Sequence, residues 1–242
     1  MRIGELFAGI GGLGLGLETA QVGHVVWQVE QDEYASKVLA KHWPRAKRYT
    51  NVEDVGAHNL EPVDLLCGGF PCQDLSISNQ KGQGLEGQRS GLWFEFERIA
   101  NELRPEWIVI ENVQHTWKRW VPVVRRRLHA IGYASVPLRL SAADVGAWHR
   151  RRRVFILAHA DSEQLRQLSR RWTGTHGQME KESIGPIRWT PRTEPPRVDD
   201  GVPHRVDRNR CLGNAVVPQC SYFIGNLIKQ LNPTVKENQH VQ

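Results

Sequence analysis

The chain has 242 residues, enough for one large domain, with or without a small appendage, to bury its core without disulfide bonds. Its four cysteines lie at positions 67, 72, 211 and 220 with no CxxC pair and no dense spacing, so we expect neither a disulfide framework nor a zinc site. The net charge of +6 and two basic clusters, at 118–127 and 149–155, favour a polyanionic partner, although the first cluster also fits a solvated helix face.

The N-terminal stretch MRIGELFAGIGG is predicted to be a strand that runs into glycines. It contains no apolar run long enough for a signal peptide or a membrane span. Together with the cysteine pattern, this predicts a soluble protein of a reduced, cytoplasmic compartment.

Short apolar runs alternate with helical segments along residues 2–160. This alternation is typical of a parallel sheet covered by helices on both faces, so the predicted fold is α/β with a doubly wound, mostly parallel sheet. The expected strands cover 2–9, 24–31, 63–71, 107–113 and 152–160. The expected helices, with apolar residues three and four apart, cover 12–22, 33–43 and 91–105.

Glycines follow the first strand in the spacing of a nucleotide-binding turn. Gly9, Gly11 and Gly14 match GxGxxG between a predicted strand and a predicted helix, and Glu30 stands near the end of the next strand. Glycine lets the backbone approach a cofactor, and an acidic side chain at that strand end can bind ribose hydroxyls. By itself the pattern fits a NAD or FAD enzyme, or a tight turn without a ligand.

The stretch GGFPCQDLSIS places a cysteine just after the third strand. Cys67 lies among apolar residues and is expected in the core, whereas Cys72 stands between a proline and a glutamine. The exposed end of a strand suits a nucleophile whose thiolate is favoured by arginines or backbone amides. Glu111 ends the following strand at the same edge of the sheet. A cysteine and an acid so placed can add a thiolate to an electron-poor heterocycle.

The sequence becomes polar and rich in proline and glycine after the domain expected at 1–160. We expect residues 161–204 to form a small irregular subdomain or a long functional loop. Residues 205–231 are expected to form a turn and an amphipathic helix that returns to the first domain, followed by a frayed tail at 232–242.

Five ordered motifs resemble those of the cytosine-C5 DNA methyltransferases. They are FAGIGG, GGFPCQDLSIS, ENV, DVGAWHRRRRVF and LGNAVVPQ. The resemblance covers about residues 2–160 and 205–230 and is closest to compact bacterial or phage-borne members. It implies a Rossmann-like methyltransferase fold in which 161–204 is a short target-recognition segment.

The resemblance implies S-adenosyl-L-methionine as the cofactor in place of NAD. Glu30 would bind its ribose, and Asn51 and Val52 would flank its adenine. The family commonly has an aspartate at the position of Asn51, and the amide keeps an acceptor oxygen. The other implied cofactor-binding residues are Phe7, Gly9, Gly11, Pro71, Leu92 and Asn214.

The resemblance also implies the catalytic residues. Cys72 would add to C6 of a flipped cytosine, and Glu111 would hydrogen-bond the ring so that C5 can take the methyl group. Arg151 and Arg153 map onto the family's arginine segment near the flipped base. Two residues depart from the family pattern: His149 replaces a glutamine, and Trp148 replaces a proline whose fixed φ helps set the loop.

The implied partner is double-stranded DNA, bound by a monomeric enzyme without a metal ion or membrane segment. The expected location is the cytoplasm of a bacterial or phage-infected cell, where such enzymes belong to restriction-modification systems. Two other function classes stay open: a catalytically inactive DNA-binding homologue, and a nucleotide-cofactor oxidoreductase with Cys72 as a redox thiol. The oxidoreductase lacks a second cysteine at CxxC spacing. RNA is an alternative substrate.

Overall fold

The computed structural model describes residues 1–71, 91–161, 163, 165 and 205–232. In this part of the chain a seven-stranded sheet has the order β3-β2-β1-β4-β5-β7-β6. The strands β1 to β5 pair in parallel, and β7 runs antiparallel to both β5 and β6. The predicted α/β fold with a mostly parallel sheet is therefore confirmed.

The strands alternate with helices along the chain, as expected. The strands are β1 (Arg2–Leu6), β2 (His24–Val29), β3 (Lys47–Tyr49), β4 (Leu65–Gly68), β5 (Trp107–Val113), β6 (Ala134–Ser141) and β7 (Arg152–His159). The α-helices are α1 (Gly12–Thr19), α2 (Glu33–His42), α4 (Leu92–Leu103), α5 (Trp117–Ala130), α7 (Arg205–Asn214) and α8 (Pro218–Leu231). Two 3-10 turns are η1 (Val52–Asp54) and η2 (Ala142–Val145).

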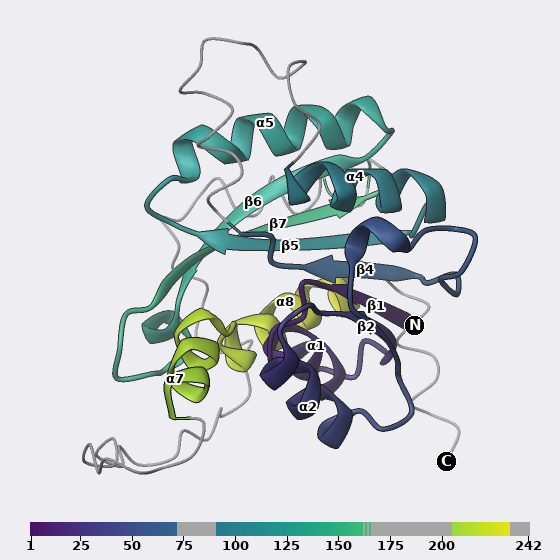
Figure 1. Ribbon diagram of the computed structural model, residues 1–242. Helices are drawn as coiled ribbons and strands as arrows, with labels where there is room; N and C mark the ends of the chain where they lie inside the picture. The colour runs from purple at the N-terminus through teal and green to yellow at the C-terminus, as the bar shows by residue number, and fades with distance from the viewer. Residues whose placement is uncertain (72–90, 162, 164, 166–204, 233–242) are drawn as a thin grey trace, which may run out of the picture.

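Helices cover both faces of the sheet because its central strands are apolar on both sides. In β5, Trp107 and Val109 pack with the apolar residues of α1 and α8, whereas Ile108 and Ile110 pack with those of α4 and α5. Successive side chains of a strand point to opposite faces, so one continuous apolar run serves two cores. Figure 1 shows the resulting three layers, with α4 and α5 on one side of the sheet and α1, α2 and α8 on the other.

Three elements differ from the sequence prediction. The edge strands β3 and β6 were not expected, because β3 has only three residues and β6 contains Pro137, which weakens a strand signal but is tolerated at an edge. The segment 205–231 was expected to be a turn followed by one amphipathic helix, but it begins with a further helix, α7, and the turn is confined to 215–217. The predicted amphipathic helix that follows is α8.

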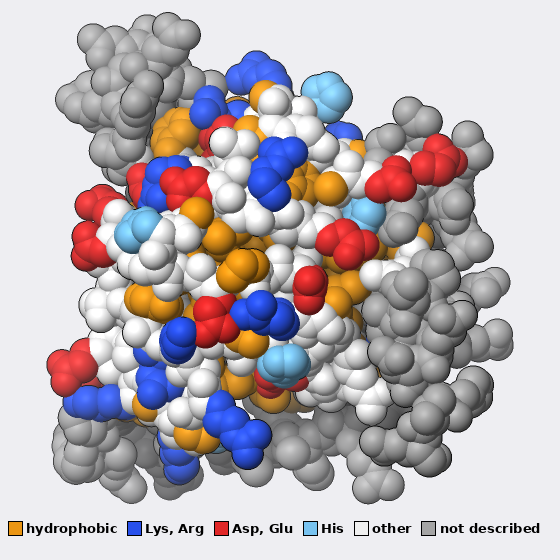
Figure 2. Space-filling view, turned by 90° about the vertical axis from the view of Figure 1, so that its right-hand side faces the viewer, with side chains coloured by type: hydrophobic (Ala, Val, Ile, Leu, Met, Phe, Trp, Pro, Cys, Tyr) orange, Lys and Arg blue, Asp and Glu red, His pale blue; other side chains and the backbone are white. Residues whose placement is uncertain are grey.

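The basic cluster 118–127 lies on α5, where part of it contributes to packing. Arg127 pairs with Glu97 of α4, and Arg125 donates to the carbonyl of Ser135 at 3.1 Å. Figure 2 shows the molecule from the side on which the N-terminus lies in Figure 1, and acidic and basic side chains of the described residues are interspersed there. The described residues on this face therefore form no one-sided charged surface of the kind that favours a polyanion.

The described residues contain no helix that is both long and apolar enough to cross a bilayer. Of the expected segment 161–204 only residues 161, 163 and 165 are described, and the tail from 233 to 242 lies outside the described residues.

Helix α8 lies directly against α1, and glycine makes this approach possible. A Cβ on Gly16 would lie 2.0 Å from Oγ of Ser221 and 2.2 Å from the carbonyl oxygen of Pro218. The Ser221 hydroxyl donates to the carbonyl of Gly12 at 3.0 Å, which joins the two helices across 209 residues of sequence. This contact brings the C-terminal part of the described chain to the helix that begins the cofactor-type turn.

We predict that Gly16→Ala lowers the free energy of unfolding by about 2 kcal/mol, because the added methyl group overpacks the contact between α1 and α8. Gly213→Ala is the matched control, since nothing lies within 4 Å of a Cβ built there and alanine favours the helix. Urea denaturation of both variants measures the difference. If Gly16→Ala were as stable as Gly213→Ala, the close contact between α1 and α8 would contribute nothing to the free energy of unfolding.

Candidate active site

A cavity of about 300 Å³ opens where the parallel strands end. It is lined by the turns after β1 and β2, by segments after β3 and β4, and by the connection between α7 and α8. The carboxyl edge of such a sheet is where ligands bind, and the volume lies at the lower end of the range for small-molecule pockets. All of the sequence-predicted cofactor residues except Gly11 line it: Phe7, Gly9, Glu30, Asn51, Val52, Pro71, Leu92 and Asn214.

The glycine turn exposes backbone to this cavity. Phe7, Gly9 and Gly11 have φ of 53°, 55° and 80°, in the left-handed region, which glycine adopts without strain. No atom lies within 4 Å of a Cβ built on Gly9, so open space adjoins the backbone there. Gly11 is the N-cap of α1, and a Cβ on it would lie 2.4 Å from the ring of Trp43. Gly11 therefore shapes the turn and does not line the cavity.

Glu30 fixes the turn from the neighbouring strand. Its Oε2 accepts from the amide of Gly9 at 2.7 Å, and its Oε1 accepts from the amide of Asp32 at 2.8 Å. Asp32 in turn caps α2, because its Oδ1 accepts from the amide of Ala35 at 2.9 Å. Asp32 also pairs with Arg210 of α7, and both of these residues line the cavity. One side of the cavity is thus acidic and held by backbone amides.

Glu5 is a second carboxyl group on the cavity wall, 1% exposed within β1. Its Oε1 accepts from the amide of Gly14 at 3.0 Å, and its Oε2 accepts from Nε2 of Gln28 at 2.9 Å. Burial raises its pKa to about 7, although these two hydrogen bonds act in the opposite direction. A Cβ on Gly14 would lie 2.8 Å from Oε2 of Glu5, so the third glycine of the motif makes room for this carboxyl group.

Asn51 and Val52 form the wall beyond β3. The side-chain oxygen of Asn51 accepts from the amide of Glu53 at 3.2 Å and caps η1. Val52 is 5% exposed and packs in the same apolar cluster as Trp93 and Phe96 of α4. Leu92, the first residue of α4, lines the cavity with them.

The end of β4 is fixed beside Glu111. Asn112 donates from Nδ2 to the carbonyl of Phe70 at 2.9 Å, and the Phe70 ring packs on Trp93 with 5.5 Å between centroids. A Cβ on Gly69 would lie 2.9 Å from Oε2 of Glu111, which shows how closely the backbone passes this carboxyl group. Pro71 and Glu111 therefore line one cavity.

Glu111 is a buried acid held by an arginine. It is 6% exposed, and its Oε1 lies 2.7 Å from Nε of Arg153. Burial raises the pKa of Glu111 to about 7, while the charges of Arg153 and Arg151 act to lower it. The acid can therefore carry a proton near neutral pH, as a general acid requires.

The four consecutive arginines alternate in direction. Arg150 and Arg152 are exposed, whereas Arg153 faces Glu111 and Arg151 donates from Nη2 to the carbonyls of Gly213 and Ala215 at 2.5 and 2.6 Å. Arg151 thus holds the connection that places Asn214 at the cavity.

The two departures from the family pattern lie just before this run. Trp148 is 65% exposed, and its ring meets that of His149 edge to face with 5.0 Å between centroids. Trp148 is thus accommodated outside the core.

The predicted nucleophile, Cys72, lies outside the described residues. The other three cysteines are described. Cys67 is fully buried, as expected, and its pKa is raised well above the usual value by burial. Burial also raises the pKa of Cys211 and that of Cys220, the latter to about 12. Cys211 lines the cavity, but a thiol with a raised pKa is a poor source of thiolate.

Sequence reasoning missed several lining residues, among them Glu5, Asp32, Arg210 and Cys211. The sequence does carry a signal for Glu5, since burying a charged residue inside an apolar strand costs free energy unless the charge has hydrogen-bond partners. No sequence signal could have paired Arg210 with Asp32, which are 178 residues apart.

The lining fits the cofactor that the resemblance implies. Open space beside the backbone of Gly9 suits a close approach, and the apolar side chains of Val52 and Leu92 suit a planar base. Carboxyl groups such as Glu5 and Glu30 suit a cationic ligand. Among the described residues, no group of three or more histidine, cysteine, aspartate or glutamate side chains is arranged to hold a metal ion.

Residues 1–195 match the family model of the C-5 cytosine-specific DNA methylases. The chain is 32% identical over 161 residues to the type II methyltransferase M.HhaI of Haemophilus parahaemolyticus, covering 65% of this chain and 48% of the relative. It is 37% identical over 164 residues to M.Eco47II of Escherichia coli, covering 64% and 38%. The chain thus spans less than half of the length of these curated relatives.

The solved structure of the S. pombe Dnmt2 methyltransferase has a similar fold, with a TM-score of 0.53 at 21% identity, covering 66% of this chain and 49% of that one.

A prediction follows from the raised pKa of Glu5. Between pH 4.5 and about 7 the unfolded chain loses this proton while the folded chain keeps it, so stability falls as pH rises through this window. Glu5→Gln keeps an acceptor for Gly14 and removes the titration. Between pH 4.5 and 7.5 the free energy of unfolding of the variant should therefore fall by about 3 kcal/mol less than that of the wild type, measured by urea denaturation. The remaining fall would come in part from Glu111. If the stabilities of the variant and the wild type depended on pH in the same way, the raised pKa of Glu5 would be contradicted.

Proposed function

Because the chain belongs to the C-5 cytosine-specific DNA methylase family, we propose that it transfers a methyl group from S-adenosyl-L-methionine to C5 of cytosine in double-stranded DNA. The observation that carries this proposal is the convergence on one cavity of Glu111 and all predicted cofactor residues except Gly11, among them Pro71, the residue before Cys72. Family membership removes the oxidoreductase alternative.

The cofactor would lie between the glycine turn and α4. Glu30 would bind the ribose hydroxyls, and Val52 and Leu92 would enclose the adenine beside Asn51. Phe7, Gly9 and Asn214 would complete the pocket, with Gly11 shaping its turn. When bound, S-adenosyl-L-methionine supplies an electrophilic methyl group on a cationic sulfur.

Cytosine C5 is a weak nucleophile until the double bond between C5 and C6 is broken. The Cys72 thiolate would add at C6, and the electron pair would move into the ring toward C5. Glu111 would hydrogen-bond at N3 and the exocyclic amine and so stabilise the adduct. After methylation, loss of the C5 proton would let the electron pair re-form the double bond and expel the thiolate.

Glu111 suits this role because burial favours its protonated form. Its pKa of about 7 places both protonation states within reach at neutral pH. Arg153 lies beside Glu111 and would keep the acid oriented toward the base. Arg151 would act near the base through the connection at Gly213–Ala215 that it holds.

A base stacked in a duplex cannot reach this cavity, so the target cytosine would be flipped out of the helix. Contacts to the phosphates from exposed arginines such as Arg150 and Arg152 would offset the cost of unstacking. We assign target recognition to residues 161–204, between the catalytic domain at 1–160 and the segment 205–231 that returns to it. A monomer in the cytoplasm, within a restriction-modification system, is the setting we propose.

Glu30 is the test of the cofactor site. We expect Glu30→Ala to weaken binding of S-adenosyl-L-methionine by about tenfold or more, because the ribose loses its acceptor and the amide of Gly9 loses its partner. Affinity for duplex DNA should change much less. Isothermal titration calorimetry measures both constants, and unchanged cofactor affinity in a folded variant would remove Glu30 from the site.

The chemistry is tested with DNA that carries 5-fluorocytosine at the target site. A proton can leave C5 but fluorine cannot leave as a cation, so the methylated adduct should stay covalently attached to Cys72. Cys72→Ala should form no adduct, and Glu111→Gln should form it much more slowly. Mass spectrometry locates the attachment. An adduct at Cys211, which lines the cavity, would overturn the assignment, and a wild type that binds DNA without methylating it would support an inactive homologue.

A further inference from the structure

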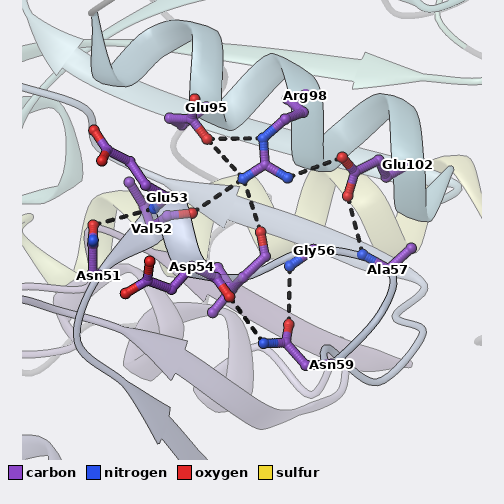
Figure 3. Close-up of polar contacts among 11 residues, drawn as sticks. Asn51, Val52, Glu53, Asp54, Gly56, Ala57, Asn59, Glu95, Arg98 and Glu102 are labelled. Carbon is purple, nitrogen blue, oxygen red and sulfur yellow. Dashed lines mark hydrogen bonds and ion pairs between the residues drawn. The ribbon is translucent and has the colours of Figure 1, made fainter.

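The guanidinium of Arg98 lies between α4 and the segment 51–57 (Figure 3). Its Nη2 donates to the carbonyls of Val52 at 3.2 Å and Val55 at 2.8 Å. Its Nε donates to Glu95 at 2.8 Å and its Nη1 to Glu102 at 2.9 Å, both on α4. One side chain thus joins two backbone carbonyls of the segment to two carboxylates of the helix.

The same helix holds the segment at a second point. Oε2 of Glu102 accepts from the amide of Ala57 at 3.0 Å. Asn59 closes the segment on itself, because it accepts from the amide of Gly56 and donates to the carbonyl of Asp54, both at 3.0 Å. Figure 3 shows these contacts, with dashed lines from Arg98 to α4 and to the segment and from Glu102 to Ala57. The turn that carries Asn51 and Val52 is therefore attached to α4 through Arg98 and Glu102.

The segment and the helix that these contacts join each contribute a residue to the cavity lining, whereas Arg98 does not line the cavity. Val52 lines it from the segment, and Leu92 lines it from the first turn of α4. Arg98 lies six positions after Leu92 on the helix, a rise of about 9 Å at 1.5 Å per residue. Arg98 therefore sets the separation of two cavity walls from outside the cavity.

Arginine suits this task better than lysine. Its planar group offers five N–H donors in a fixed geometry, and four different acceptors surround it here. The two glutamates orient the guanidinium, and a charged donor to a carbonyl makes a strong hydrogen bond. A lysine ammonium could reach only part of this set.

We propose that Arg98 is a positioning residue for the adenosine part of the cofactor, holding the Asn51–Val52 turn at the separation from Leu92 that encloses the adenine. The inference rests on the proposed function, since it takes these residues as the adenine site. Arg98 acts through Val52 and touches no reacting atom.

The test measures the dissociation constants of S-adenosyl-L-methionine, S-adenosyl-L-homocysteine and duplex DNA for the wild type, Arg98→Met and Arg98→Lys. We expect Arg98→Met to weaken the binding of both adenosyl compounds about tenfold and by the same factor, because the two compounds share the adenosine and differ only at sulfur. Arg98→Lys should recover part of this loss. DNA affinity should change less than twofold.

Arg127→Met is the matched control. Arg127 ties α5 to the same helix through Glu97 and lies over the ring of Phe94, with 4.9 Å to its centroid, and it makes no hydrogen bond or ion pair to the described segment 51–57. It should lower the melting temperature without changing the affinity for either adenosyl compound. Equal losses of adenosyl affinity in Arg127→Met and Arg98→Met would mean that the effect is only destabilisation and would overturn the inference.

A second measurement keeps the inference testable if Arg98→Met does not fold. In Arg98→Lys, hydrogen exchange at the amides of residues 53–57 should be faster than in the wild type, and S-adenosyl-L-homocysteine should slow it. If a folded variant keeps both the wild-type exchange rates and the wild-type affinity for the adenosyl compounds, the positioning role of Arg98 is overturned, while the proposed function stands. A wild type that binds neither adenosyl compound would overturn the proposed function and this inference together.

Discussion

Burial of the central strands on both faces is the constraint on which the rest of the structure depends. β4 and β5 are apolar along almost their whole length, so helices must cover each side of the sheet. Parallel strands bring their carboxyl ends to the same edge of the sheet, and the segments that follow β1, β2, β3 and β4 meet there beside Glu111 of β5. The cavity is a consequence of this arrangement, because Phe7, Glu30, Pro71 and Glu111 each follow or end a strand.

The buried carboxyl groups give this edge its chemistry. Glu5 and Glu111 share a pKa of about 7 but differ in what surrounds them. Glu5 meets a backbone amide and the amide of Gln28, which fix the wall of the cavity. Glu111 meets Arg153, which offsets part of the effect of burial on its charged form. The first arrangement supports a binding surface, and the second suits proton chemistry.

Contacts between distant segments complete the site. Ser221 ties α8 to α1, Arg151 holds the connection that carries Asn214, and Arg98 holds the turn that carries Val52. Each of these side chains acts on backbone carbonyls, so it fixes the path of the chain and leaves the lining side chains to meet a ligand. The four arginines 150–153 divide in the same way, because Arg151 and Arg153 point inward to Gly213–Ala215 and Glu111, whereas Arg150 and Arg152 are exposed.

The sequence by itself determined the fold class and part of the cavity lining. Apolar runs such as 107–113 that alternate with helical segments predict central strands, and the carboxyl ends of parallel strands share one edge, so Glu30, Pro71 and Glu111 were expected together. Local patterns were insufficient for the edge strand with Pro137 and for helix α7, whose structure depends on neighbours more than on their own propensity. Only the tertiary structure decided that Glu5 lines the cavity, that Asp32 meets Arg210, and that Arg98 reaches two carbonyls some 45 residues away. The physical reason is that periodicity reports which face of an element is buried, whereas these contacts depend on the packing of elements that are distant in the sequence.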